Sequence, residues 1–280
     1  MIKLFEQFNN EQEIREICKE YNIENYTINS DGSIDVDGDV DLSWRGTLER
    51  LPLIFNKVKG SFCCNVNKLT SLKGCPKEVG DTFNCSENLL TSLEGCPIKV
   101  DGYFDCSENL LTSLEGCPKE VGDTFNCSKN KLTSLKGCPK EVNGDFIFSN
   151  NLITYIDYCP NIIEGSFNCD NNNLTSLEGG PMEVKGLNCG NNKITTLKGA
   201  PILIGRNLDL YNNPISIIDG SIDVVGSIYI KYTNFDDEIK NLSQEKLKIL
   251  FEHGVDYVVF RKDGTVNYSR LERLFKDFGV

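Results

Sequence analysis

The sequence predicts an α+β solenoid in which each coil contributes one short parallel β-strand and small helix–hairpin units cap both ends. Three observations lead to this prediction. A segment of about 21 residues recurs along the chain, its apolar residues fall in fixed columns, and both ends depart from the repeat. A fixed period of roughly 20 to 50 residues is typical of solenoids, in which each unit packs against its neighbours.

An asparagine marks the middle of each copy, at a constant spacing except for one step that is a single residue shorter. These residues are Asn67, Asn88, Asn109, Asn130, Asn151, Asn172, Asn192 and Asn213. A buried amide needs hydrogen-bond partners, and an asparagine at the corner between a strand and a turn can bond the backbone of the adjacent coil. We therefore expect this column to tie neighbouring coils together.

The residues around the asparagine predict a short strand followed by an extended return leg. In the clearest copy, residues 80–100, the segment Phe83-Asn84-Cys85 alternates apolar and polar residues, as a strand with one buried face does. Leu90 and Leu93 then turn inward over the same core. Because Pro97 fixes φ and removes a backbone donor, the return leg is expected to be extended rather than helical.

This pattern, LxLxxNxLxxL with Phe, Cys or Ile replacing several leucines, resembles that of leucine-rich-repeat proteins. The Leu-Thr-Ser-Leu run and the proline are similar to the short LPX-type repeats of secreted bacterial effectors. The likeness is closer to leucine-rich-repeat proteins of large tailed bacteriophages, which the lead-in at residues 25–40 also resembles. The resemblance covers about residues 20–235 and implies a leucine-rich-repeat solenoid. After the repeats, the chain has no room for the large ligase domain of the effectors.

Three segments are expected. Residues 1–58 would form an N-terminal cap, with an amphipathic helix at 3–20, a hairpin at 26–36 and a degenerate repeat. Residues 59–235 would form the solenoid, and residues 236–280 a C-terminal cap of helix, hairpin and helix. Terminal coils must depart from the repeat because they cover the exposed ends of the core. The last segment could instead be a small effector module.

Charge and hydropathy restrict the classes of partner and the location that we expect for this protein. The net charge of −12 argues against nucleic acid, whose phosphates attract clustered Lys and Arg, and fits a neutral or basic protein partner. No apolar run approaches the length of about 18 residues that spans a membrane, and the N-terminus lacks the apolar region of a signal peptide. We therefore expect a cytoplasmic protein, in the host bacterial cytoplasm if it is phage-encoded.

Eleven of the 13 cysteines fall in two columns of the repeat. Because other coils place Phe, Leu, Gly or Ala in the same columns, we interpret these cysteines as compact apolar residues. We expect them to be buried, reduced and unpaired in a reducing compartment. The strand column holds Cys64, Cys85, Cys106, Cys127, Cys169 and Cys189, and the second column holds Cys75, Cys96, Cys117, Cys138 and Cys159.

The sequence predicts no catalytic residue, no metal site and no cofactor. The one histidine, His253, lies at the end of a predicted helix, where it would cap rather than catalyse. The run of aspartates at residues 31–41 departs from a calcium loop, because Val40 and Gly46 stand where the loop needs Gly and Glu. On one strand, Asp35, Asp37, Asp39 and Asp41 would form a solvated acidic stripe, which remains a possible docking surface.

We expect binding on the exposed face of the strands, mainly in the C-terminal half. Early coils offer mostly Ser and Asn there, whereas tyrosines, which combine area with a polar tip, gather in the last coils. The alternative is that the C-terminal cap covers these tyrosines. The candidates are Tyr211, Tyr229, Tyr232, Asp209, Lys231, Ile147 and Asp170, with Tyr103 and Asp105 as a weaker N-terminal pair.

These expectations favour a non-enzymatic protein-binding solenoid. The resemblance implies a phage-encoded factor that binds and modulates or blocks a host or defence protein. Two alternatives stay open: a structural or assembly component of the virion, and a small effector activity in residues 236–280.

Overall fold

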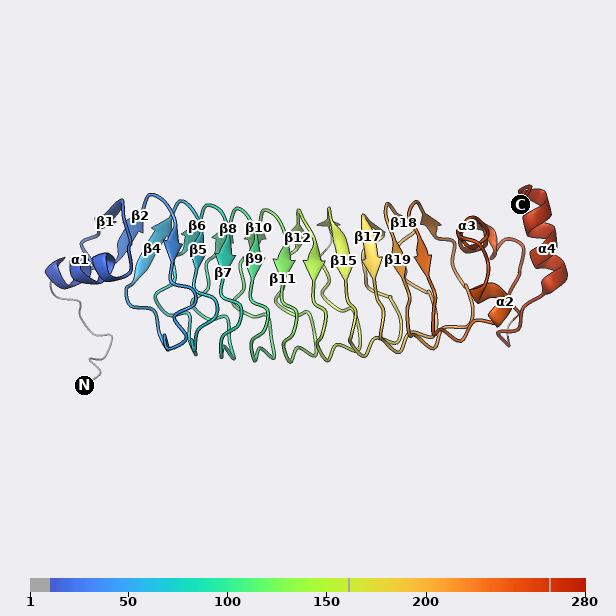
Figure 1. Ribbon diagram of the computed structural model, residues 1–280, viewed down its shortest axis with the longest axis horizontal. Helices are drawn as coiled ribbons and strands as arrows, with labels where there is room; N and C mark the ends of the chain where they lie inside the picture. The colour runs from blue at the N-terminus through green and yellow to red at the C-terminus, as the bar shows by residue number, and fades with distance from the viewer. Residues whose placement is uncertain (1–10, 161, 262) are drawn as a thin grey trace. The chain divides into compact units, whose positions relative to one another are not determined.

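The computed structural model describes residues 11–160, 162–261 and 263–280. It confirms the predicted fold class, a β-solenoid of about 9 parallel-strand coils with about 21 residues per turn and few helices (Figure 1). Contacts within the chain define two compact units. Unit 1 comprises residues 1–131 and 137–142, and unit 2 comprises residues 132–136 and 143–280.

Each coil of unit 1 carries two short strands, one more than the repeat predicts. The expected strands pair in parallel and form the front sheet; they are β3 (Val40–Asp41), β5 (Phe62–Cys63), β7 (Phe83–Asn84), β9 (Phe104–Asp105) and β11 (Phe125–Asn126). The return legs form a second, back sheet of β2 (Ile34–Val36), β4 (Phe55–Val58), β6 (Glu78–Val79), β8 (Lys99–Val100), β10 (Glu120–Val121) and β12 (Glu141–Val142). The second strand forms because an extended return leg offers its backbone groups to the next coil in register, as Val79 does to Val100.

The helix and the hairpin expected near the N-terminus are both present in the described residues. Helix α1 (Glu11–Glu20) precedes an antiparallel hairpin of β1 (Tyr26–Ile28) and β2. The hairpin turn is held by Asp31, whose carboxylate accepts the backbone N–H of Ser33 at 3.0 Å. The predicted helix began earlier, with Leu4, Phe5 and Phe8 on its apolar stripe; these three residues lie outside the described part of the chain.

Unit 2 repeats the same coil. Its front sheet consists of β13 (Phe146–Ile147), β15 (Ser166–Asn168), β17 (Gly186–Asn188), β19 (Leu208–Asp209) and β21 (Ile228–Tyr229), paired in parallel. On the return legs lie β14 (Ile162–Ile163) and a sheet of β16 (Glu183–Val184), β18 (Leu203–Ile204) and β20 (Asp223–Val224). The ninth strand expected at residues 226–235 is therefore present as β21.

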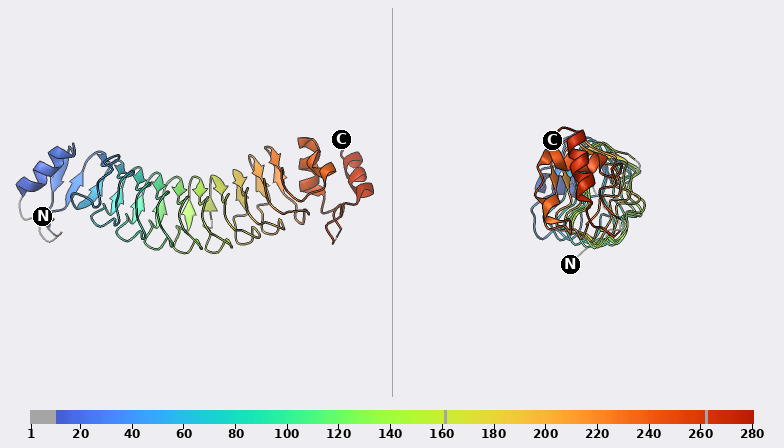
Figure 2. Two further views of the ribbon diagram at one scale, coloured as in Figure 1. Left: turned by 60° about the horizontal axis from the view of Figure 1, so that its bottom comes forward. Right: turned by 90° about the vertical axis from the view of Figure 1, so that its right-hand side faces the viewer.

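Three helices follow the last coil of unit 2 (Figure 2). The helix expected after residue 236 is divided into α2 (Asp237–Lys240) and α3 (Gln244–His253), because Asp236 and Ser243 each cap a new N-terminus through the side chain. The hairpin expected after α3 is reduced to a single bridge between Phe260 and Val266. Helix α4 (Tyr268–Asp277) ends the chain as predicted.

The core consists of the predicted columns, and the asparagine column ties the coils together. Asn88 is 5% exposed. Its Nδ2 donates to the carbonyl oxygens of Cys85, 3.1 Å away in its own coil, and of Cys64, 3.0 Å away in the preceding coil. Its Oδ1 accepts the N–H of Leu69 at 2.9 Å. The same set of bonds recurs at Asn109 in the next coil.

Asn67, at the start of the array, departs from this pattern. Its Nδ2 donates to the carbonyl of Leu42 at 2.9 Å, but its buried Oδ1 finds no donor among the described residues. The preceding coil is the degenerate capping repeat, and its Leu48, the counterpart of Leu69, does not bring an N–H to this oxygen. In the first asparagine of the column, therefore, only the amide nitrogen has hydrogen-bond partners.

The residue before each column asparagine adopts a left-handed conformation. Val66 does so with φ 55°, although this region is unfavourable for a β-branched residue; the same position is Asn150, Asn191 and Asn212 in later coils. We expect Val66→Asn to raise the free energy of unfolding by about 1 kcal/mol, since asparagine tolerates this conformation. Urea unfolding of the two proteins measures the change, and an unchanged or lower stability would count against local strain at this residue.

The cysteine columns differ in burial. Free thiols of the strand column, such as Cys64, Cys85 and Cys106, are fully buried. In the column before the proline, Cys75 is buried, but Cys96, Cys117, Cys138 and Cys159 are half-buried. The expectation of complete burial is thus wrong for these four, because the turn that carries them lies at the rim of the coil.

Burial raises the pKa of the Cys85 and Cys106 thiols well above the usual value, and that of Cys138 to about 12. A thiol whose pKa is raised by folding stabilises the native state below its unfolded pKa, and this stability is lost as the pH rises through the folded pKa. We therefore expect the free energy of unfolding to fall as the pH rises above about 8.5, the pKa of an unfolded thiol, with the fall already under way between about pH 8.5 and pH 10. Denaturant titrations across this range measure it, and a rise in stability would be incompatible with protonated buried thiols.

Candidate protein-binding face

The front face, meaning the solvent side of the front sheets, is less polar in unit 1 than the repeat suggests. Serines expected to be exposed there, including Ser86 and Ser128, are buried. The strand residue two positions earlier causes this: Oδ1 of Asn84 accepts both the N–H of Ser86 at 2.9 Å and its hydroxyl at 2.7 Å. Asn126 holds Ser128 in the same way. These serines therefore stabilise the turn rather than offer hydrogen bonds to a partner.

Tyr103 and Asp105, the weaker predicted pair, bind each other. The Tyr103 hydroxyl donates to Asp105 Oδ2 at 2.8 Å, and Asn126 donates to the same hydroxyl at 3.2 Å. Asp105 is only 8% exposed and also accepts the N–H of Ser107. Burial raises the pKa of Tyr103. The pair is engaged within unit 1, so it offers little to a partner.

The predicted acidic stripe is wrong as a single strand face. Asp35 lies on β2 in the back sheet and Asp41 on β3 in the front sheet, with a turn between them. Their carboxylates meet local donors: Asp35 accepts from Asn56 at 2.7 Å, and Asp37 pairs with Lys59 at 2.8 Å. The aspartates therefore point in different directions and do not form one docking surface.

The tyrosines of the last coils form an exposed cluster in unit 2. Tyr229 is 48% exposed and Tyr232 is 59% exposed. The ring of Tyr211 packs edge-on against that of Tyr232 with centroids 5.2 Å apart, and the ammonium of Lys231 lies 5.0 Å from the Tyr232 centroid. The candidate residues of the last two coils are thus brought together as predicted.

The C-terminal helices lie beside this cluster without covering it. Gln244 at the start of α3 bonds both backbone groups of Ile228, at 2.7 Å to the N–H and 2.9 Å to the carbonyl. Helix α3 is thereby fixed to the strand of Tyr229, whose own ring stays exposed. A hollow of about 650 Å³ remains between the last front strands and the helices α2 and α3. It is lined by Asp209, Tyr211, Ile228, Tyr229, Ile230, Lys231, Tyr232, Asp237, Lys240, Asn241, Leu242, Gln244 and Leu247.

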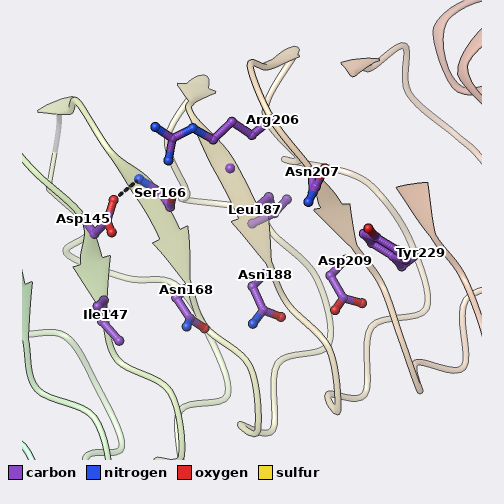
Figure 3. A pocket seen from close by; sticks show the side chains of 11 residues that line it. Asp145, Ile147, Ser166, Asn168, Leu187, Asn188, Arg206, Asn207, Asp209 and Tyr229 are labelled. Atoms are coloured by element: carbon purple, nitrogen blue, oxygen red, sulfur yellow. Dashed lines mark hydrogen bonds between the residues drawn. The ribbon is translucent and has the colours of Figure 1, made fainter. Parts of the chain in front are cut away.

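A second hollow, of about 320 Å³, lies on the front face of unit 2 (Figure 3). It includes three predicted residues, Ile147, Asp209 and Tyr229, and its other lining residues are Asp145, Ser166, Asn168, Gly186, Leu187, Asn188, Arg206 and Asn207. Asp170 does not line it: this carboxylate is half-buried, which raises its pKa, and it accepts from Asn171. Asp170 is therefore a neighbour of the hollow, close enough for the charge of Asp209 to act on it, and not part of its lining.

Arg206 and Gly186 are two of the lining residues of this hollow that the sequence did not single out. The signal was the one shortened step of the repeat, between Asn172 and Asn192. One residue is missing from the turn before β17, and a glycine begins this strand where β15 of the previous coil has Ser166. The shortened coil therefore leaves the hollow.

Trp44 is a further exposed aromatic residue that the sequence did not single out. It is 74% exposed, it lies in the N-terminal capping coil, and its φ is 56°. The guanidinium of the adjacent Arg45 lies 5.1 Å from the ring centroid of Tyr21. Trp44 occupies the left-handed position that asparagines occupy in later coils, so an indole is held outward there.

Residues 11–160, 162–261 and 263–280 contain no group of three or more His, Cys, Asp or Glu residues placed to hold a metal ion. His253 stacks on Phe278 with ring centroids 4.4 Å apart. None of the described helices has the length and apolar character needed to cross a membrane.

Comparison with protein-family models gives no match, and comparison with curated proteins gives none at a significant level.

Proposed function

We propose that this chain is a non-enzymatic protein-binding solenoid whose partner docks on the front face of unit 2. The observation that carries the proposal is the cluster of the exposed Tyr229 and Tyr232 with the half-buried Tyr211, beside a hollow of about 650 Å³. Tyrosine is enriched among residues that dominate binding energy, since it buries a large area at small conformational cost and keeps a polar tip. The hollow gives a partner side chain a place to be desolvated.

The support of this face is rigid, which favours binding. Tyr229 lies on β21, paired in register with β19, and Asn213 ties the coil of β19 to the one before it through the carbonyl of Cys189 at 2.9 Å. Side chains on such a support lose little further freedom when a partner docks.

The resemblance of the repeats to leucine-rich-repeat proteins of large tailed bacteriophages supports a more specific proposal. The partner is then a host or defence protein in the bacterial cytoplasm, which the chain modulates or blocks. Buried free thiols such as Cys85 and Cys106 are in keeping with a reducing compartment.

Affinity capture from bacterial cells, followed by mass spectrometry, tests the proposal and names the partner. For that partner, Tyr229→Ala and Tyr232→Ala are each expected to weaken binding by at least about 1 kcal/mol, roughly fivefold in Kd. The matched control is Tyr155→Ala, which removes an equally exposed tyrosine (63%) away from the cluster. Unchanged Kd values for the folded cluster variants would remove this face from the binding site.

A further inference from the structure

Three amides of the second hollow are oriented with their donors outward. Oδ1 of Asn168 accepts the N–H of Asp170, and Oδ1 of Asn188 accepts the N–H of Gly190, both at 3.3 Å. Oδ1 of Asn207 accepts the N–H of Ser227 at 2.9 Å. Because a backbone N–H fixes each oxygen, the Nδ2 group of each asparagine faces away from the backbone. None of these three Nδ2 groups has a hydrogen-bond partner in the described residues.

Arg206 adds an unpaired cation to the same hollow. Its exposed side chain extends across β17 toward Ser166 (Figure 3). Many exposed cations of this chain pair with a carboxylate, as Lys129 does with Glu108 at 2.7 Å. The Arg206 guanidinium makes no ion pair among the described residues, although Asp145 and Asp209 line the hollow with it.

The two aspartates are already turned to backbone donors. Asp145 accepts the N–H of Ser166 at 2.7 Å, and Asp209 accepts the N–H of Tyr211 at 2.8 Å. Asp145 directly precedes β13 and Asp209 lies on β19, with β15 and β17 between these two strands. The two aspartates are therefore separated by three strand spacings of about 4.8 Å each. A negative group placed between them is therefore separated from both by a distance close to the screening length of about 8 Å in physiological salt. Among the free side-chain groups between them, the Arg206 guanidinium and the amide nitrogens only donate, and the Ser166 hydroxyl can also donate.

Donors of this kind select an acceptor that is planar and negatively charged. A guanidinium binds a carboxylate through two parallel N–H groups. The amides of Asn168 and Asn188 lie toward the other end of the hollow from the Arg206 guanidinium (Figure 3), so they offer donors to other groups of the same bound segment. Asn168 and Asn188 face each other in register on neighbouring strands, so a row of donors crosses the sheet. An extended chain that crosses the strands in the same direction can place its main-chain carbonyls along this row.

We propose that the second hollow binds an acidic side chain, Asp or Glu, carried by an extended segment of the protein partner. The inference rests on the proposed function and specifies the chemistry of the partner at this part of the front face. Because the chain as a whole carries a net charge of −12, the acidic residue is a local contact in a segment that is otherwise neutral or basic.

A display library of random short peptides, selected on the full chain, tests this proposal without knowledge of the natural partner. Selected peptides are expected to be enriched in a single Asp or Glu. Replacing that residue by its amide should weaken binding to the native chain about tenfold and binding to Arg206→Gln less than twofold, the behaviour of a coupled pair. Arg273→Gln, which removes an exposed arginine of α4, is the control and should keep the tenfold loss.

A second variant tests the hollow itself. Gly186 has no positive φ, and a Cβ there would meet Ser166 Oγ at a tight 3.2 Å. Because that atom is a side-chain hydroxyl that can rotate aside, Gly186→Asn should fold and fill the hollow. It is expected to bind the selected peptides at least about tenfold more weakly. Two results would overturn the inference: selected peptides that are not enriched in Asp or Glu, or a loss of binding on replacing the peptide's acid by its amide that is the same in Arg206→Gln as in the native chain. If binding of the captured partner still depends on Tyr229 and Tyr232, the proposed function survives that result. If partner binding does not depend on these tyrosines and peptide binding does not depend on Arg206, both the proposed function and this inference are wrong.

Discussion

Replacement of Asn109 by leucine is expected to lower the free energy of unfolding by more than about 3 kcal/mol. Asn109 is 5% exposed, and its amide bonds the carbonyls of Cys85, Cys106 and Ser107 at 3.0, 3.2 and 3.1 Å, while its oxygen accepts the N–H of Leu90 at 3.0 Å. Leucine has a similar size but leaves the buried N–H of Leu90 without its acceptor, which costs about 1–3 kcal/mol. It also removes one hydrogen bond from each of the three carbonyls, about 0.5–1.5 kcal/mol apiece, although these carbonyls still accept from Asn88, Asn130 and Glu87.

Asn67 provides the matched control in the same column. Its Oδ1 accepts no hydrogen bond from the described residues, so Asn67→Leu leaves no N–H without its acceptor. Urea unfolding of both variants should show a smaller loss for Asn67→Leu than for Asn109→Leu. Equal losses would mean that the column acts by packing alone and does not join the coils through hydrogen bonds.

Gly122→Ala is expected to destabilise the chain by about 3 kcal/mol or to prevent folding. A Cβ at Gly122 would lie 1.9 Å from the carbonyl oxygen of Asp101 and 2.7 Å from its carbonyl carbon. Both atoms belong to the backbone of the preceding coil, so a rotamer change cannot relieve the overlap. The turns of two neighbouring coils would have to move apart, at the expense of the bond from the Gly122 N–H to the carbonyl of Val100, which is 3.0 Å long.

Gly220→Ala is the corresponding control. A Cβ at Gly220 meets nothing within 4 Å, and its φ is not positive, so this variant should change stability by less than about 1 kcal/mol. Thermal unfolding and the yield of soluble protein report both variants. A Gly122→Ala protein that melts with the native chain would contradict the close stacking of the turns.

The repeat predicted most of the fold, because its columns carry physical requirements that are local to one coil. Phe83 and Phe104 could be placed in one stack from their spacing alone, and their rings lie 5.7 Å apart. The second strand of each coil was missed, since Glu78–Val79 becomes a strand only by pairing with Lys99–Val100 of the next coil. Pairing between coils depends on how closely they stack, which the sequence of one coil does not state.

The binding face could be predicted in part. The position of Tyr229 follows from its place on the last strand, and the sequence placed it outward correctly. Burial of Ser86 by Asn84 was not foreseen, because it depends on a side-chain-to-backbone turn rather than on strand alternation. The hollow at Gly186 could not be predicted, because the effect of the missing residue appears only when neighbouring coils are stacked.

A photocrosslinking amino acid tests the central claim, that the front face of unit 2 holds a protein partner, most directly. The photoreactive residue p-benzoylphenylalanine is placed at Tyr229 in cells that contain the natural partner, and in parallel at Tyr155, which is exposed away from the cluster. Irradiation is expected to join one protein covalently to the chain from Tyr229, while Tyr155 gives no such product. A crosslink to the captured partner from Tyr155, with none from Tyr229 in the folded chain, would contradict the claim.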